Sequence, residues 1–168
     1  MPHVFGDGDV DATGLRAAIV VSLFNDQFTK RLCDGAIATA KDLGVDDDDI
    51  AVFWVPGAFE LPLVAQELAI TGAYDAIACV GAVVRGETPH FNFVAGEAAR
   101  GIMEVSRETG VPIGFGVITA DTLAQAEARA GGTVANRGSE AMYAALHVAA
   151  LLRSVDALDA AAVEEDPA

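Results

Sequence analysis

The chain has 168 residues, a length typical of one domain, and 52% of them are apolar, which allows a hydrophobic core without disulfides or metal. The formal net charge of −15 excludes binding of nucleic acid through its phosphate backbone, because such binding requires a basic surface. Only two of the ten cations are lysines, Lys30 and Lys41, and the acids include the run Asp46–Asp49. An ordinary solvated surface would account for this balance. We nevertheless favour a halophilic protein, because salt screens the self-repulsion.

The location predicted from the sequence is a reducing cytoplasm. No stretch of about 18 residues lacks a charge or a Gly or Pro break, so no transmembrane helix is predicted. The first residues do not have the pattern of a signal peptide. Cys33 and Cys79 are far apart and the three histidines are scattered, so we expect neither a disulfide nor a metal site.

Short apolar runs alternate with longer amphipathic segments along the chain. The apolar runs predict buried strands at 15–23, 50–55, 74–84 and 112–119. The amphipathic segments predict helices at about 26–43, 60–71, 92–109, 122–130 and 138–154. Asn25 and Asp26 offer N-cap side chains for the first helix, and Gly44 is placed to end it.

This alternation predicts an α/β protein. Strands that are apolar throughout are buried on both faces, so we expect a three-layer α/β/α sandwich with a four-stranded parallel sheet, flavodoxin-like in arrangement. An added N-terminal strand is left open. The expected organisation is an N-terminal arm at 1–12, one domain at 13–156 and a disordered acidic tail at 157–168. Ligands of such folds bind beyond the carboxyl ends of the strands, here just after residues 23, 55 and 84.

Two of these strand ends carry residues suited to a planar polar ligand. Phe24 and Asn25 could stack on and hydrogen-bond a heterocycle, or they could complete the core and cap a helix. After the second strand, Pro56-Gly57 predicts a tight turn. Glu60 could then accept hydrogen bonds from hydroxyl groups, or simply favour the start of its helix.

The third strand end has the sequence GAVVRGETPHF at 81–91. The segment is not a Walker loop, because the glycine spacing and the Lys-Ser/Thr pair are missing. It can still present main-chain amides, the Thr88 hydroxyl and a helix N-terminus to a phosphate or carboxylate. His90 is placed to transfer protons there, although an isolated loop histidine often has no chemical role. Three weak indications at one sheet edge together favour a binding site.

The segments Phe24-Asn25, VPGAFELP, GAVVRGETPHF and FGVIT…QAEARAG…NRG together resemble the 6,7-dimethyl-8-ribityllumazine synthase family, over residues 13 to 153. The resemblance implies a condensation of 5-amino-6-(D-ribitylamino)uracil with 3,4-dihydroxy-2-butanone 4-phosphate, with release of phosphate and water and no cofactor. It implies a cytoplasmic homo-oligomer, a pentamer or a multiple of one, with active sites between neighbouring subunits. It leaves open an association with riboflavin synthase, and implies no nucleic-acid or membrane partner.

The resemblance also implies roles for individual residues. His90 matches the proton-transfer histidine. The positions implied to bind the aminoribityluracil are Phe24, Asn25, Ala58, Phe59, Glu60, Ala82, Val83, Val84, Phe115 and Arg137. The positions implied to bind the butanone phosphate are Glu87, Thr88 and Arg129. Phe115 and Arg129 match positions that the neighbouring subunit contributes. Phe115 lies early in the last predicted strand, where the ligand edge of its own subunit is hard to reach. This position agrees with the assignment.

The chain departs from the family pattern at two places. Arg137 stands where the family often has lysine, and the loop at 131–136 has the length found in capsid-forming members without their usual lysine. The choice between pentamer, decamer and 60-subunit capsid is therefore open. Two other functions are also considered, an archaeal-type riboflavin synthase and a non-enzymatic flavin-binding shell. The presence of Thr88, His90 and Arg129 favours lumazine synthesis over the flavin-binding shell.

Overall fold

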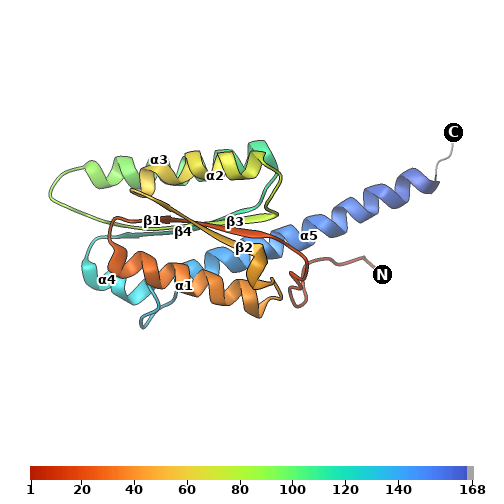
Figure 1. Ribbon diagram of the computed structural model, residues 1–168, viewed down its shortest axis with the longest axis horizontal. Coiled ribbons are helices and arrows are strands. Elements are labelled where there is room, and N and C mark those ends of the chain that lie inside the picture. The colour runs from red at the N-terminus through yellow and green to blue at the C-terminus, as the bar shows by residue number, and fades with distance from the viewer. Residues whose placement is uncertain (166–168) are drawn as a thin grey trace.

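The computed structural model describes residues 1–165 and shows a four-stranded sheet with helices on both faces (Figure 1). The strands are β1 (Ala17–Ser22), β2 (Ile50–Val55), β3 (Ala76–Val84) and β4 (Ile113–Ala120). They are all parallel and lie in the order β2-β1-β3-β4. The predicted α/β fold with a four-stranded parallel sheet is confirmed. Within residues 1–165, nothing before β1 joins the sheet, so the N-terminal strand that the sequence left open is not formed.

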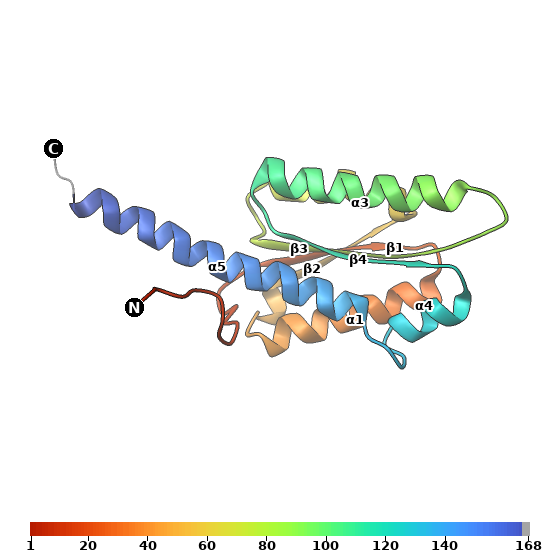
Figure 2. The same cartoon turned by 180° about the vertical axis from the view of Figure 1, so that it is seen from behind.

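The helices form two layers. They are α1 (Asp26–Asp42), α2 (Leu61–Ile70), α3 (His90–Thr109), α4 (Leu123–Arg129) and α5 (Arg137–Glu165), with short 3₁₀ turns η1 (Asp47–Asp49) and η2 (Ala58–Glu60). Helices α1, α4 and α5 cover one face of the sheet, and α2 and α3 cover the other (Figures 1 and 2). Each face therefore has its own hydrophobic core.

Strand β1 shows why its sequence is apolar at every position. Ile19 and Val21 pack in the core beneath α1 and α5, whereas Ala18 and Val20 pack in the core beneath α2 and α3. All four side chains are fully buried. Successive side chains of a strand point to opposite faces, so a sheet covered on both sides requires apolar residues at consecutive positions.

Helices α1 and α5 cross at a close contact between their backbones. A Cβ on Gly138 would collide with the main-chain oxygen of Leu32, so this position requires glycine. Beside it, Asn136 Nδ2 donates to the main-chain oxygen of Arg31 (3.0 Å). Asn136 Oδ1 accepts from the main-chain nitrogens of Gly138 and Ser139. Asn136 thereby caps α5 and joins it to α1.

Helix α5 is longer than predicted. The sequence placed its end at Ser154, whereas the helix continues to Glu165. Residues 157–165 belong to the predicted disordered tail, and they are helical in the structure because an alanine-rich segment has a high intrinsic helix propensity. The last part of that predicted tail, 166–168, lies outside the described residues.

The first half of α5 serves as a core helix. By length and composition alone, Arg137–Leu158 could cross a membrane. However, Met142 and Leu146 in this stretch are fully buried, and α5 packs against α1, β3 and β4. A helix that covers a sheet needs such an apolar stripe, and this packing explains the apolar residues on the buried face of α5.

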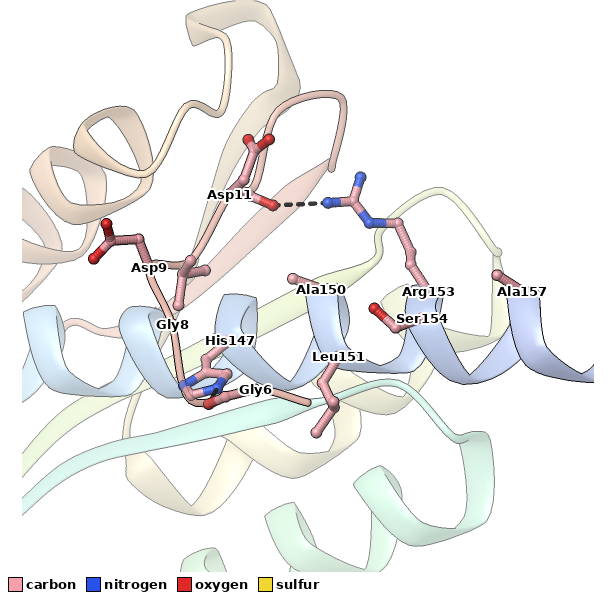
Figure 3. Close-up of a pocket in the computed structure, with 11 residues that line it drawn as sticks. Gly6, Gly8, Asp9, Asp11, His147, Ala150, Leu151, Arg153, Ser154 and Ala157 are labelled. Carbon is pink, nitrogen blue, oxygen red and sulfur yellow. Dashed lines mark hydrogen bonds between the residues drawn. The ribbon is translucent and has the colours of Figure 1, made fainter. Parts of the chain in front are cut away.

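The N-terminal arm lies against α5 at the amino ends of the strands (Figure 3). Arg153 donates through Nη2 to the main-chain oxygen of Asp11 (2.7 Å) and through Nη1 to that of Thr13 (3.1 Å). A ring nitrogen of His147 lies 3.0 Å from the main-chain oxygen of Gly6. The cavity of about 440 Å³ between the arm and α5 is therefore at the opposite end of the sheet from the predicted site.

Candidate active site

A cavity of about 720 Å³ opens at the carboxyl ends of β1, β2 and β3. It lies beside the boundary between β1 and β3, where the strand order reverses, which is the usual ligand position in open parallel sheets. The cavity is lined by Phe24, Pro56, Gly57, Ala58, Phe59, Glu60, Ala82, Val83, Val84, Gly86, Thr88, His90, Phe91, Phe93 and Val94. The structure thus brings together residues from all three predicted segments.

The segment after β1 places one aromatic ring in the cavity, and a main-chain hydrogen bond connects this segment to the turn after β2. Phe24 is 72% exposed and lines the cavity, and its main-chain nitrogen donates to the oxygen of Pro56 (3.1 Å). The N-cap interaction predicted for Asn25 is wrong, because its side chain makes no capping hydrogen bond. Instead, Asn25 Nδ2 donates to the main-chain oxygen of Ala82 (2.8 Å) and its backbone is left-handed, with a φ of 61°. This bond ties the end of β1 to the end of β3.

The turn after β2 supplies one wall of the cavity. Gly57 is followed by η2, in which Ala58 is buried and Phe59 is 60% exposed. The carboxylate of Glu60 folds back towards Gly57, since a Cβ on that glycine would lie 3.2 Å from Glu60 Oε2. The Glu60 carboxylate therefore lies at the cavity wall, where it can accept hydrogen bonds from hydroxyl groups.

The segment after β3 forms an exposed loop that leads directly into a helix. Thr88 and His90 line the cavity, while Glu87 lies in the same loop outside the lining residues. Helix α3 begins at His90, two residues before the predicted start at 92, because Pro89 already has a φ of −69° that suits a helix start. His90 therefore stands in the first turn of α3, where free main-chain N–H groups favour a nearby anion.

The first turns of α3 add residues that the sequence analysis missed. Phe91, Phe93 and Val94 line the cavity, and Phe93 is 68% exposed. The sequence places Phe91 only in the segment before a helix, and Phe93 and Val94 only within the helix expected at 92–109. The signal that could have identified them is their place in the first turns of a helix that begins at a predicted ligand edge. Pro56, Gly57 and Gly86 also line the cavity, although the sequence assigned them only to turns.

Besides Asn25 and Glu87, three predicted site residues do not line this cavity. Phe115 pairs with Cys79 in the sheet, well before the carboxyl end of β4, and is 45% exposed. Arg129 ends α4 and donates through Nη1 to the main-chain oxygen of Gln125 (3.0 Å). Arg137 begins α5 and forms an ion pair with Glu140.

The charges at the cavity are few. Glu60 and His90 are its titratable lining residues, and within the described residues 1–165 no lysine or arginine is among the lining. In the same part of the chain, no group of three or more His, Cys, Asp or Glu side chains is arranged to hold a metal ion. The cavity is thus mainly aromatic and aliphatic, with one carboxylate, one imidazole, one hydroxyl and main-chain polar groups. This lining suits a planar polar ring and a sugar-like chain.

Comparison with known protein families agrees with this geometry. The model of the family described as 6,7-dimethyl-8-ribityllumazine synthase matches residues 14–153. The matched range includes the whole sheet and each residue that lines the cavity. The chain therefore belongs to the 6,7-dimethyl-8-ribityllumazine synthase family, whose enzymes catalyse the condensation that forms this lumazine in riboflavin biosynthesis.

Proposed function

We propose that the cavity at the carboxyl ends of β1, β2 and β3 is the site of this condensation and that its residues bind 5-amino-6-(D-ribitylamino)uracil. The observation that carries the proposal is the exposed ring of Phe24 beside the main-chain groups of Ala82–Val84. An aromatic ring can stack on the uracil while main-chain N–H and C=O groups bind its edge. Phe59 and Glu60 are placed to contact the ribityl chain, and the Glu60 carboxylate can accept hydrogen bonds from its hydroxyl groups.

The phosphate of 3,4-dihydroxy-2-butanone 4-phosphate binds, in this proposal, at the loop after β3. Thr88 offers a hydroxyl there, Glu87 belongs to the same loop, and α3 directs its N-terminal amides to it. These groups carry no permanent positive charge. A phosphate is best held by a planar guanidinium, and the cavity's own lining supplies none. We therefore assign this role to Arg129 of a neighbouring copy of the chain.

In the proposed reaction, the 5-amino group of the uracil attacks the ketone of the butanone phosphate and water is lost, which gives an imine. Phosphate is then eliminated, and the resulting enol tautomerises to a ketone. The ribitylamino nitrogen attacks this carbonyl, and loss of a second water closes the ring. His90, in the first turn of α3, transfers protons during imine formation and elimination, which raises the reaction rate about 10²- to 10⁴-fold.

Holding the two reactants together accounts for most of the acceleration in this proposal. The correct placement of two reactants contributes up to about 7–11 kcal/mol to lowering a barrier. The stacked uracil, the anchored ribityl chain and the bound phosphate fix both molecules at three points. This division of labour requires no cofactor, and a variant without His90 retains part of the rate enhancement.

The family is typically oligomeric, and for this chain we propose a homo-oligomer that is a pentamer or a multiple of one. Phe115, Arg129 and Arg137 support the proposal, because each is at least partly exposed and lies outside the chain's own cavity. A neighbouring subunit can receive Phe115 against its bound uracil, Arg137 near the ribityl chain and Arg129 on its phosphate. An association with riboflavin synthase stays open in this proposal.

The site-sharing proposal is tested by mixing two variants of low activity. His90→Ala removes the proton-transfer group of one cavity, and Arg129→Ala removes the phosphate ligand offered to the next. When the two variants are dissociated, mixed and reassembled, some cavities contain both native residues, and lumazine formation rises above that of either variant alone. Mixtures of each variant with itself, treated identically, are the controls. Activity that stays at the average of the two variants contradicts a shared site.

The composition supports a further proposal about the protein's surroundings. The family consists of soluble biosynthetic enzymes, which agrees with a cytoplasmic location. The chain has 25 acidic and ten basic residues, so the carboxylates of the folded protein repel one another at low ionic strength. We propose a salt-rich cytoplasm, in which this repulsion is screened over a few ångströms.

A further inference from the structure

Arg85 connects both ends of the loop that carries Thr88 and His90. It follows β3 directly, and its main-chain nitrogen donates to the oxygen of Ala120 (2.8 Å), which extends the pairing of β3 with β4. Its Nε donates to Asp121 Oδ1 (2.7 Å), just beyond β4. The start of the loop is therefore attached to the end of the neighbouring strand.

The same guanidinium reaches the other end of the loop. Arg85 Nη1 donates to Asn92 Oδ1 (3.3 Å) in the first turn of α3. The guanidinium carbon lies 4.2 Å from the centre of the Phe91 ring, in a cation–π contact. Phe91 is the residue after His90 and itself lines the cavity. One planar group thus contacts the end of β4 and the two residues that follow His90.

Little else in the chain holds this loop. Residues 85–90 are exposed, and within the described residues 1–165 the side chains of Thr88 and His90 form no hydrogen bond to protein. Arg85 is not among the residues that line the cavity. The contacts of Arg85 therefore fix the position of the loop, and Arg85 does not need to contact a bound substrate.

We propose that Arg85 is a positioning residue that fixes His90 and Thr88 through Phe91, Asn92 and Asp121. The proposal rests on the proposed function of His90 and Thr88. A displacement of about 1 Å at a catalytic group can lower a rate by about 10²-fold. By contrast, an exposed ion pair such as Arg85–Asp121 contributes little to global stability, because solvent screens it. The effect of losing Arg85 is therefore expected in the rate and not in folding.

The arrangement also requires arginine rather than lysine. Nε and Nη1 donate to two different partners at once, while the guanidinium carbon lies over the Phe91 ring. An ammonium group can pair with Asp121 but cannot match this planar geometry. Arg85→Lys should therefore keep the charge and lose most of the positioning.

The experiment compares Arg85→Ala and Arg85→Lys with the matched control Arg100→Ala. Arg100 also forms an exposed ion pair at α3, with Glu97 (3.0 Å), but it is remote from the loop. For Arg85→Ala we expect kcat to fall about 10- to 100-fold, with an unchanged KM for the aminoribityluracil, since Phe24 and Ala82–Val84 are untouched. Arg85→Lys recovers only a small part of the loss. Arg100→Ala has the kcat and thermal midpoint of the wild type.

A double variant separates positioning from a general loss of structure. If Arg85 acts through His90, Arg85→Ala lowers the rate much less in a His90→Ala background than in the wild type. Hydrogen exchange provides a second readout, with faster exchange at residues 86–92 in Arg85→Ala than in Arg100→Ala. Equal rate losses in both backgrounds, or a fully active Arg85→Ala, overturn the proposal. An inactive wild type would instead refute the proposed reaction, so the two failures are distinguishable.

Discussion

Asn25 Nδ2 donates a 2.8 Å hydrogen bond to the main-chain oxygen of Ala82, across the floor of the candidate site. Asn25 lies just after β1 and Ala82 lies near the end of β3, and these two strands are adjacent in the sheet. The bond is made possible by a left-handed backbone at Asn25, a conformation that asparagine tolerates better than most residues. The ring of Phe24 and the main-chain groups of Ala82 are thus fixed relative to each other.

Substitution of Asn25 should therefore reveal two separate costs. Asn25→Gly loses the hydrogen bond but accepts the positive φ, so we expect a destabilisation of about 1 kcal/mol. Asn25→Ala also incurs the strain of a left-handed backbone, which adds about 1 kcal/mol. Denaturant unfolding at one fixed protein concentration measures both values. Equal unfolding free energies for the two variants would show that the backbone conformation at this position is not strained by alanine.

Replacement of His90 should slow the enzyme without abolishing its activity. For His90→Gln we expect kcat to fall about 10²- to 10⁴-fold, because proton transfer is lost while the binding of both reactants remains. His3→Gln, in the exposed N-terminal arm, is the control and should match the wild type. The measurement is steady-state lumazine formation by both variants. A folded His90→Gln oligomer with wild-type kcat, or with no activity above the uncatalysed reaction, contradicts the proposed division of labour.

The two cysteines should be unreactive in the native protein. Burial raises the pKa of the Cys79 thiol to about 12. Burial, with a smaller contribution from Asp34, raises the pKa of Cys33 to about 11. The reactive species is the thiolate, so we expect neither thiol to react with an alkylating reagent at pH 8 until the protein unfolds.

The same pKa shifts make the stability of the folded state depend on pH. The folded state retains these protons more tightly than the unfolded state, so the stabilising contribution of each thiol is complete below its ordinary pKa. It is lost as the pH rises through about 11 for Cys33 and about 12 for Cys79. Mass spectrometry after alkylation, with and without denaturant, tests the accessibility. Rapid labelling of Cys79 in the native protein would contradict its burial.

Salt should stabilise the fold and the assembly. At a net charge of −15, raising the ionic strength from about 0.1 M to 1 M shortens the screening length from about 10 Å to 3 Å, which weakens repulsion between the acidic surfaces. We expect the thermal midpoint to rise with potassium chloride and the oligomer to persist at lower protein concentration. Scanning calorimetry and light scattering measure the two effects. Identical midpoints, assembly and activity at low and high salt refute the halophilic proposal.

The sheet was predictable because its signals are local and strong. The run at 50–55 coincides with β2, and the strand predicted at 112–119 differs from β4 by one residue at each end. Glycines placed after helices, such as Gly44 and Gly110, do have positive φ values. Such agreement is expected where burial on both faces and the backbone requirements of turns indicate the same boundary.

Other features depend on contacts between distant segments. The bond from Asn25 to Ala82 spans 57 positions, and a sequence that offers Asn before a helix predicts a cap instead. The Arg85 contacts likewise join residues from β3, α3 and the end of β4. Acidic residues near the end of a chain predict disorder, whereas α5 extends to Glu165. Helix propensity outweighs that signal in an alanine-rich segment.

The candidate site could be predicted in part from the residues alone. Phe24, Glu60 and His90 follow three different strands, and their convergence follows from the rule that parallel strands end at one edge. Arg129 and Phe115 could be assigned only through the family resemblance. The structure of one chain shows them away from its own cavity, and their proposed partner is another copy.

The proposed condensation is tested by the products that the wild-type chain forms. Purified protein, treated with a chelator and passed through gel filtration, is mixed with the aminoribityluracil and the butanone phosphate in high and in low salt. Lumazine fluorescence and released phosphate are measured together. We expect one phosphate for each lumazine, with no added cofactor. A folded oligomer that forms no lumazine in either salt, or that instead converts lumazine to riboflavin, contradicts the proposed condensation.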